Sequence, residues 1–327
     1  MILVTGGSGF IGSNLHASLT ADGHEVIIAD WLGHDGQKWR NLYHHPPSTL
    51  IEPEQLGEFL TQDAGITTIV HLGAISETTA TDADLVWRTN VTLSQKLWAW
   101  CAERGVRLIY ASSASTYGSG SVGFDDGMSL PALQKLRPLN LYGWSKHAFD
   151  LWVARQVSDH APAPPNWAGV KFFNVFGPNE YHKGKMISVV KVKHDEVISG
   201  GSARLFKSNC SEVPDGEQKR DFIYIDDVVA ALKFLITAPN LSGTFNLGTG
   251  TARTYLDLAR TVCWAAGLPE RIEFIEMPAA LRGQYQSFTQ ASMKRLKALG
   301  FNHKFMTLEE GVTNYVQNYL SKADPYK

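Results

Sequence analysis

The sequence predicts an α/β fold in which a doubly wound parallel sheet is combined with a smaller, mixed α/β domain. Three observations support this prediction. Strand-like runs alternate with helical patterns over the first half of the chain, a glycine-rich turn joins the first strand to the first helix, and the order becomes less regular beyond Gly177. Alternation of strands with helices is typical of a parallel sheet that carries helices on both faces.

The expected strands are short apolar runs separated by helical patterns. The runs lie at residues 1–6, 25–30, 67–74, 107–113 and 169–177, and the helical patterns cover residues 11–22, 53–63, 83–104 and 143–157. Beyond them we expect a helix near 186–198, a strand and a helix within 220–236, a strand within 243–250, and two or three terminal helices.

Composition limits the classes of protein. The chain has 327 residues, 44% of them hydrophobic, and a formal net charge of −2, so nothing attracts it to nucleic acid or to an anionic membrane. Cys101, Cys210 and Cys263 are far apart and lack metal-site or disulfide spacing. The first strand begins at Ile2, which leaves no room for a signal peptide, and no apolar run approaches the ~20 residues of a membrane span. We expect a soluble cytoplasmic protein without a metal.

The turn TGGSGFIG at residues 5–12 places Gly6, Gly9 and Gly12 in GxxGxxG spacing. Gly6 permits the tight turn, Gly9 lets the backbone approach a pyrophosphate, and Gly12 lets the helix pack closely on the strand. Phe10 and Ile11 open the helix, whose N–H groups and dipole favour phosphate. The motif predicts a Rossmann-like dinucleotide-binding domain of residues 1–177 with a return segment at about 222–247. Residues 178–221 and 248–327 would form the substrate-binding domain.

Signals for the choice of dinucleotide conflict. Asp30 ends the second strand-like run, where a carboxylate can accept a hydrogen bond from the ribose 2′-hydroxyl of NAD. Lys38 and Arg40 follow in GQKWRNL, and these cations suit the 2′-phosphate of NADP, although they can equally be ordinary surface charges. We expect NADP, with NAD as the alternative. Ala74, at the end of the third run, is expected to lie against the same cofactor.

A redox motif lies at residues 139–152, where Tyr142 precedes Lys146 by four residues and shares a helix face with it. A neighbouring ammonium favours the phenolate, so Tyr142 can accept the proton as hydride leaves a secondary alcohol. Lys146 can also bind the cofactor ribose. Ser113, in ASSASTYG, stands where its hydroxyl can hold the reacting oxygen, although it can also be a satisfied hydroxyl at a strand end.

The glycine motif, the strand-end serine and YxxxK, in this order and spacing, resemble the extended short-chain dehydrogenase/reductase superfamily. The resemblance implies that Asn90, in WRTNVTLS, holds its helix and the active-site water beside the cofactor. Dehydratases of this superfamily carry an Asp-Glu pair at the position where this chain reads SAST, because departing hydroxide needs an acid. We therefore do not expect dehydration.

Longer phrases resemble the ADP-L-glycero-D-manno-heptose 6-epimerase family of lipopolysaccharide core biosynthesis. These phrases are GQKWRNL, HLGAISETTATDAD, RPLNLYGWSK, FFNVFGPNEYHKGKM, KRDFIYIDDV, FNLGTG and RGQYQSFTQA. The resemblance implies an isomerase that inverts C6 of ADP-D-glycero-β-D-manno-heptose, giving ADP-L-glycero-β-D-manno-heptose through a 6-keto intermediate with a tightly bound nicotinamide cofactor. It also implies a homo-oligomer, a pentamer in that family.

Inversion moves the alcohol oxygen, so one phenolate cannot easily serve both epimers and a second base is physically sensible. The resemblance assigns that role to Lys183, in the HKG phrase, which can otherwise be a solvated loop charge. The substrate diphosphate needs a cation, and we expect Arg220 to bind it, unless Arg220 pairs with Asp221. The expected substrate contacts are Ser113, Asn174, His182, Lys183, Arg220 and Tyr285.

Two other functions stay open. A UDP- or dTDP-hexose 4-epimerase or reductase would share the scaffold but would not need Lys183, and a non-catalytic dinucleotide sensor would tend to lose Tyr142 or Lys146. The chain also departs from the family it resembles. It has Tyr181 where the family often has Gly, a longer segment between Ser113 and Tyr142, and the insertion NCSEVPDGEQ.

Overall fold

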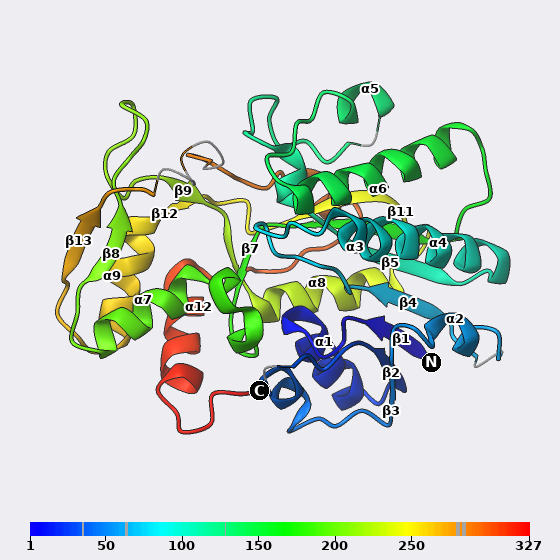
Figure 1. The fold of residues 1–327 in the computed structure, drawn as a ribbon, viewed down its shortest axis with the longest axis horizontal. Coiled ribbons are helices and arrows are strands. Elements are labelled where there is room, and N and C mark those ends of the chain that lie inside the picture. The colour runs from blue at the N-terminus through cyan, green and yellow to red at the C-terminus, as the bar shows by residue number, and fades with distance from the viewer. Residues whose placement is uncertain (35, 63–64, 128, 279–281, 283–285) are drawn as a thin grey trace.

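The computed structural model describes the chain apart from residues 35, 63–64, 128, 279–281 and 283–285. Its centre is a seven-stranded sheet in the order β11-β6-β5-β4-β1-β2-β3, with every neighbouring pair parallel (Figure 1). The strands are β1 (Ile2–Thr5), β2 (Val26–Ala29), β3 (Thr49–Ile51), β4 (Thr68–His71), β5 (Arg107–Ser113), β6 (Trp167–Phe172) and β11 (Ser242–Leu247). The expected doubly wound parallel sheet is confirmed.

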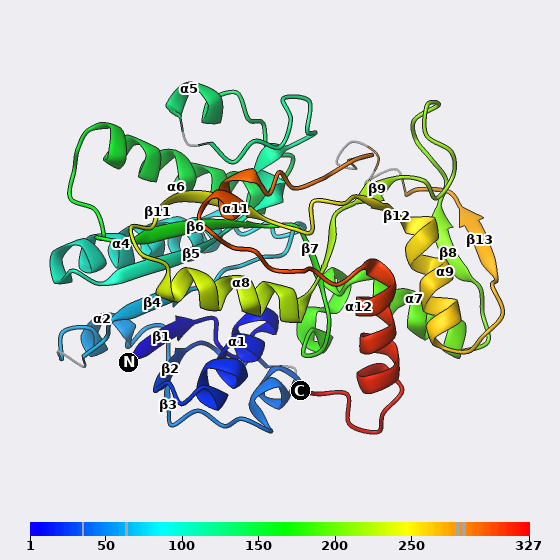
Figure 2. The ribbon, with the colours of Figure 1, turned by 180° about the vertical axis from the view of Figure 1, so that it is seen from behind.

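Helices cover both faces of this sheet, as Figures 1 and 2 show. Alternate residues of a strand point to opposite faces, so Ile2 and Val4 enter one apolar cluster while Leu3 enters another. The first cluster includes side chains of α1 (Phe10–Ala21) and α8 (Ile225–Thr237), and the second includes side chains of α4 (Leu93–Arg104) and α6 (Leu141–Ser158). The site is therefore built on a sheet with a core on each side.

The remaining strands pair outside the large sheet. β7 (Asn174–Phe176) pairs in parallel with β10 (Phe222–Tyr224), β8 (Ala203–Phe206) with β13 (Ile272–Ile275), and β9 (Lys219–Arg220) runs antiparallel to β12 (Arg253–Thr254). Figure 1 shows the β8–β13 pair at one end of the molecule, beside three helices. These are α7 (Val189–Ile198), α9 (Tyr255–Ala265) and α12 (Leu308–Tyr315), which continues into the π-helical turn η5 (Val316–Leu320).

Short helical segments complete the described part of the chain. They are η1 (Lys38–Leu42), α2 (Leu56–Phe59), α3 (Ala83–Trp87), η2 (Arg88–Thr92), η3 (Ala114–Tyr117), α5 (Leu130–Leu133), η4 (Tyr181–Met186) and α11 (Lys294–Ala298). None of the helices in the described residues has the length and apolar character that a membrane crossing requires.

Three expected elements differ from the structure. Residues 169–177 do not form one strand, because β6 pairs with β5 and β11 in the large sheet whereas β7 pairs with β10 outside it. The helix expected at 53–63 is reduced to α2, a segment weakened by Gly57. The helix expected at 83–104 is continuous but contains the π-helical turn η2.

Candidate active site

Several of the predicted site residues lie at or just after the ends of strands of the large sheet. Gly6 follows β1, Ala74 follows β4, Ser113 is the last residue of β5, and Asn174 begins β7 just after β6. β1 lies between β2 and β4, so the strand order reverses at this point. In open parallel sheets ligands bind at the carboxyl ends of the strands, beside such a reversal.

The glycine turn forms a cradle that a side chain would fill. Gly6 has a φ of +69°, and a Cβ atom there would lie 2.6 Å from the backbone nitrogen of Gly73. A Cβ atom at Gly12 would collide with the carbonyl oxygen of Gly6. Gly9 caps α1 without a side-chain hydrogen bond, which leaves the first N–H groups of the helix, from Phe10 onward, to a ligand. These features fit the pyrophosphate of a dinucleotide.

Asp30 is held by four hydrogen bonds. Its Oδ2 atom accepts from the backbone N–H and the hydroxyl of Ser8, at 3.0 and 2.5 Å. Its Oδ1 atom accepts from the N–H of Trp31 and from Nζ of Lys38, both at 2.8 Å. Asp30, which favours NAD, and Lys38, which favours NADP, thus form an ion pair, and the ammonium of Lys38 neutralises the carboxylate of Asp30. Arg40 lies exposed on η1.

Tyr142 lies in the first turn of α6. Asn140 caps this helix by accepting a hydrogen bond from the N–H of Gly143 at 2.8 Å. A Cβ atom at Gly143 would lie 2.8 Å from the carbonyl oxygen of Ser115, so the helix packs directly on the backbone that follows β5. This close approach brings the Tyr142 phenol near the hydroxyl of Ser113.

Electrostatics at Tyr142 and Lys146 follow from burial. Burial raises the pKa of the Tyr142 phenol, and the neighbouring hydroxyl of Ser113 acts to lower it. Burial lowers the pKa of the Lys146 ammonium to about 8, while the carboxylate of Asp150 acts to raise it. A phosphate-bearing cofactor would add negative charge near Lys146 and so favour its ammonium form.

Asn90 supports α6 rather than pointing freely into the site. Its side-chain amide exchanges two hydrogen bonds with the backbone of Ile75, both of 2.9 Å, and donates a third to the hydroxyl of Ser145, also at 2.9 Å. Ser145 donates in turn to the carbonyl oxygen of Tyr142 at 2.7 Å. Asn90 lies in the π-helical turn η2, so the extra residue in that turn is placed where the loop beside Ala74 meets α6.

A second hydrogen-bonded chain lies beneath the glycine turn. His71 is buried at the end of β4, with its Nδ1 atom 2.6 Å from the hydroxyl of Thr5 and its Nε2 atom 2.9 Å from the hydroxyl of Ser94. Burial, together with the charge of Lys146, lowers the pKa of His71 to about 3. The imidazole is therefore neutral and serves to connect β1 to α4.

Sequence reasoning missed the buried polar cluster around Asp150. Its carboxylate accepts hydrogen bonds from Lys171, Ser112 and Tyr110, and Lys171 also donates to Thr116 at 2.9 Å. The signal that could have revealed it is a lysine inside an otherwise apolar strand run, GVKFF. The cluster links β5, β6 and α6 below the reactive residues.

Lys183 lies on η4, close to the start of α1. Its Nζ atom is 5.0 Å from the centre of the Phe10 ring and 4.0 Å from Oε2 of Glu180. Phe10 is the first residue of α1, so the predicted second base adjoins the cofactor turn. His182, beside it, has its Nδ1 atom 3.1 Å from the side-chain nitrogen of Asn41 on η1. The structure thus brings the HKG phrase next to the dinucleotide cradle.

Arg220 lies on β9 with little exposure, and its guanidinium is 5.5 Å from the centre of the Tyr255 ring. The neighbouring carboxylate of Asp221 accepts four hydrogen bonds from Thr249, Gly250 and Ala291. Asn174 is exposed at the start of β7, and its backbone N–H donates a hydrogen bond to the backbone carbonyl oxygen of Asp221.

The remaining predicted contact, Tyr285, lies outside the described residues. Tyr181, one of the departures from the family pattern, donates a hydrogen bond to the carbonyl oxygen of Pro325 at 2.7 Å. It also packs edge-on against Tyr326, with the ring centres 5.0 Å apart. Tyr181 therefore fastens residues 325–326 to the loop that carries Lys183. The inserted residues project as the tall loop between β8 and β9 in Figure 1.

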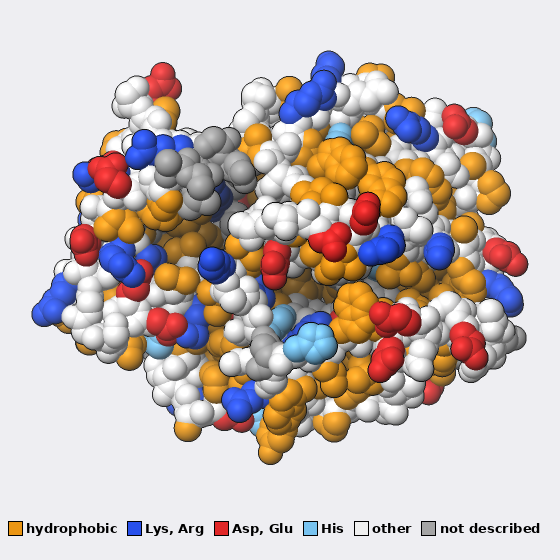
Figure 3. Space-filling model, viewed as in Figure 1, with side chains coloured by type: hydrophobic (Ala, Val, Ile, Leu, Met, Phe, Trp, Pro, Cys, Tyr) orange, Lys and Arg blue, Asp and Glu red, His pale blue; other side chains and the backbone are white. Residues whose placement is uncertain are grey.

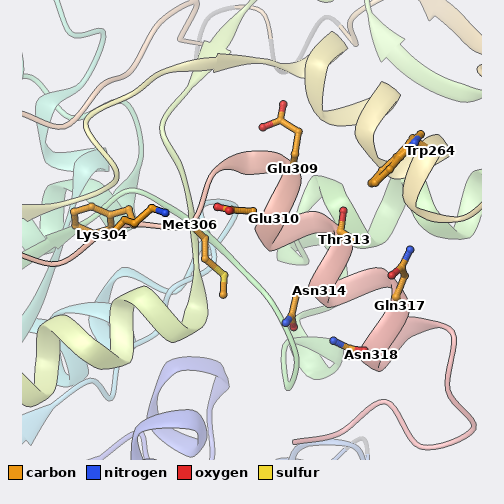
Figure 4. A pocket seen from close by; sticks show the side chains of 10 residues that line it. Trp264, Lys304, Met306, Glu309, Glu310, Thr313, Asn314, Gln317 and Asn318 are labelled. Carbon is orange, nitrogen blue, oxygen red and sulfur yellow. The ribbon is translucent and has the colours of Figure 1, made fainter.

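Two other surface features lie apart from these residues. A cavity of about 610 Å³ runs along α9 and α12, between Trp264 and residues such as Glu309 and Gln317, and contains none of the predicted site residues (Figure 4). Figure 3 shows hydrophobic side chains gathered over α3 and α6. Trp87 and Trp144, on these helices, are both partly exposed and lie 5.4 Å apart between ring centres.

Comparison with known proteins agrees with this geometry. Residues 2–248 match the model of the NAD dependent epimerase/dehydratase family. The chain belongs to this family. It is 43% identical to the ADP-L-glycero-D-manno-heptose-6-epimerase of Fusobacterium nucleatum, with 100% of each chain covered.

Solved structures are similar to this chain as well. The crystal structure of the Helicobacter pylori ADP-L-glycero-D-manno-heptose-6-epimerase has a TM-score of 0.79 at 26% identity, covering 97% of this chain and 95% of that one. MoeE5, in complex with UDP-glucuronic acid and NAD, has a TM-score of 0.70 at 26% identity, covering 95% and 96%. The predicted resemblance and the predicted enzyme class, an epimerase, are confirmed, and a nicotinamide cofactor fits the family.

Proposed function

We propose that this protein inverts C6 of ADP-D-glycero-β-D-manno-heptose to give ADP-L-glycero-β-D-manno-heptose, for lipopolysaccharide core biosynthesis. The observation that carries the proposal is the position of Lys183, which adjoins Phe10 at the start of the cofactor helix, in a chain that also holds Ser113, Tyr142 and Lys146. Curated relatives at 43% and 42% identity bear the name ADP-L-glycero-D-manno-heptose-6-epimerase.

The reacting residues divide into two groups. Tyr142 would accept the proton of the C6 hydroxyl in one epimer, with Ser113 holding the oxygen and Lys146 stabilising the phenolate. Lys183 would exchange the proton of the oxygen in the other epimer. When bound, the nicotinamide supplies the acceptor and donor of the hydride. Gly6, Gly9 and Gly12 would let the backbone approach its pyrophosphate, and Phe10 and Ile11 would offer N–H groups.

We propose NADP as the cofactor. Lys38 neutralises Asp30 at 2.8 Å, and a neutral pair removes the repulsion that a lone carboxylate would exert on a 2′-phosphate. NAD remains the alternative, because the same pair presents a carboxylate oxygen at the strand end. Ala74 and Asn90 would border the nicotinamide half, Asn90 by holding the backbone of Ile75.

The substrate would lie between the two proposed domains, residues 1–177 with 222–247 and residues 178–221 with 248–327. Arg220 would bind the diphosphate, and Asn174, His182 and Tyr285 would contact the sugar or diphosphate. The division is supported by β11, which joins the large sheet from far along the chain. A homo-oligomer, a pentamer by resemblance, and a cytoplasmic location complete the proposal.

NMR of purified protein incubated with ADP-D-glycero-β-D-manno-heptose tests the function. We expect the C6 signals to change to those of the L-glycero epimer until both epimers are present at equilibrium. UDP-glucose serves as the second substrate, and epimerisation at C4 of that sugar with no change at C6 of the heptose would favour a hexose 4-epimerase. No change in either sugar, with cofactor bound, would contradict both enzymes.

A further inference from the structure

Glu180 is a fully buried carboxylate at the start of the loop that carries Lys183. Its Oε2 atom accepts a hydrogen bond from the N–H of Ser188 at 2.7 Å, and its Oε1 atom accepts one from the Ser188 hydroxyl at 2.6 Å. Ser188 is the N-cap of α7, so Glu180 is fixed to the start of that helix. The nearest cation in the described contacts of Glu180 is Lys183, at 4.0 Å.

Lys183 is confined on two sides. Its ammonium has the buried carboxylate of Glu180 on one side and the face of the Phe10 ring, 5.0 Å away, on the other. Only 25% of its side chain is exposed. A cation between a carboxylate and an aromatic face is held by both, and this one is held next to the cofactor turn.

The proposed inversion sets a proton requirement on Lys183. In one direction Tyr142 takes a proton from the substrate hydroxyl, hydride leaves and returns to the same carbon, and Lys183 gives a proton to the oxygen in its new place. Each turnover therefore leaves Tyr142 with one proton more and Lys183 with one fewer. Lys183 must be reprotonated before the next turnover, so the charge beside it matters.

We propose that Glu180 is a positioning residue for Lys183: its buried carboxylate holds the ammonium against the cofactor turn. The negative charge of Glu180 also favours the protonated form of Lys183. The effect on the reaction rests on the proposed function, whereas the effect on Lys183 does not. The other groups that face the pair are Ser188, Tyr181 and, from α12, Tyr315.

Opposing influences act on the pair. Burial lowers the pKa of Lys183, and the charge of Glu180 acts to raise it. Burial raises the pKa of Glu180, while the charge of Lys183 and the hydrogen bonds from Ser188 act to lower it. Removing the Glu180 charge leaves burial unopposed at Lys183.

The test is competitive acylation of lysines in the intact holoenzyme over a range of pH, with modification of Lys183 measured by mass spectrometry. In Glu180→Gln the midpoint of Lys183 modification should fall by about one pH unit or more. Glu196→Gln is the matched control, because Glu196 forms an i,i+3 pair with Lys193 on α7 at 2.8 Å. That variant should leave the Lys183 midpoint unchanged.

A midpoint for Lys183 that stays unchanged in folded Glu180→Gln would overturn the proposal. If circular dichroism shows that Glu180→Gln does not fold, Glu180→Asp withdraws the carboxylate by one methylene and should move the midpoint in the same direction by less. The Lys183 midpoint in that variant then decides.

The pH profile of C6 inversion supplies the second readout. The part of the pH–rate profile that reports the ionisation of Lys183 should move to lower pH in Glu180→Gln. When Lys183→Met is already present, adding Glu180→Gln should cause no such shift. A shifted Lys183 midpoint in a protein that inverts no heptose would retain the pairing and reject the proposed function. Inversion by the wild type with an unmoved Lys183 midpoint in the variant would reject only the role of Glu180.

Discussion

The Nζ atom of Lys171 lies 2.5 Å from the Oδ2 atom of Asp150, and neither side chain is exposed to solvent. Asp150 is one helical turn beyond Lys146 on α6, and Lys171 lies on β6, between β5 and β11 in the large sheet. A buried ion pair has given up the hydration of both ions, so its partners depend on one another. This pair therefore ties α6, which carries Tyr142 and Lys146, to the large sheet.

Lys171→Met should lower the free energy of unfolding by about 3–5 kcal/mol, because it leaves the Asp150 carboxylate buried without its cation. Urea unfolding measures the change. Lys191→Met is a matched control, since Lys191 lies at the same 2.5 Å from Asp195 but that carboxylate is 59% exposed. The control should cost less than about 1 kcal/mol. Equal losses in the two variants would show that burial of the Lys171 pair has no special weight.

Tyr142→Phe should reduce turnover by about 10²–10⁴-fold, because it removes the group proposed to accept the substrate proton. The cofactor should remain bound, since the glycine turn is untouched. Initial rates of C6 inversion and the amount of nicotinamide bound per chain give the two readouts. Tyr43→Phe, at a side chain that is 63% exposed, controls for loss of a phenol elsewhere. Normal turnover in Tyr142→Phe would remove Tyr142 from the mechanism.

Lys183→Met should impair inversion without weakening nucleotide binding. The substitution keeps the length of the side chain but removes the amine that would exchange the second proton. Rates of inversion and calorimetric binding of ADP separate the two effects. Lys185→Met, two residues along the same loop, should leave both unchanged. If the Lys183 variant inverts at the normal rate, Lys183 is only a loop charge.

Lys38→Gln should shift the bound cofactor from NADP toward NAD. Without its partner, the Asp30 carboxylate would repel a 2′-phosphate and could accept from a ribose hydroxyl. Mass spectrometry of the nucleotide that co-purifies measures the choice. Recovery of NAD alone from the wild type would show that Asp30 already outweighs Lys38.

His71 should make the protein sensitive to acid. Burial holds its pKa near 3, whereas in the unfolded chain it returns to about 6.5, so the unfolded state binds the extra proton. The contribution of His71 to the free energy of unfolding is fully present above pH 6.5 and is lost progressively as the pH drops toward 3. Between pH 7 and pH 5 the loss is about 2 kcal/mol. Urea unfolding of His71→Gln should show a shallower loss than the wild type, whereas exposed His24→Gln should show the same loss.

Local patterns in the sequence predicted the fold class, which the structure confirms, and the residues that are proposed to react. The glycine turn and YxxxK are short motifs whose geometry depends on adjacent residues, so they can be interpreted without tertiary information. The ion pair of Asp150 and Lys171 joins a helix to a strand, and nothing in the sequence of either segment indicates that the other segment holds its partner. The break between β6 and β7 was missed for a similar reason, because β7 is drawn away by pairing with β10.

The sequence also did not indicate which charged residues pair with one another, even where the partners are near each other in the chain. Asp30 and Lys38 were interpreted as competing signals, although they neutralise one another in space. The sequence does not predict the burial of Glu180, because a glutamate before an aromatic residue in a loop is typical of an exposed surface charge. Its burial is set by α7, which follows it, and by α12, which arrives from much later in the chain.

The contact between Gly143 and the carbonyl of Ser115 has a consequence for directed evolution of this enzyme. The spacing of Tyr142 from Ser113 is set by one main chain resting on another, and main-chain atoms are the same in every variant. A mutant library can therefore diversify the loops that would meet the sugar without disturbing that spacing. Position 143 itself should tolerate no amino acid other than glycine, so every active variant selected from such a library should keep Gly143.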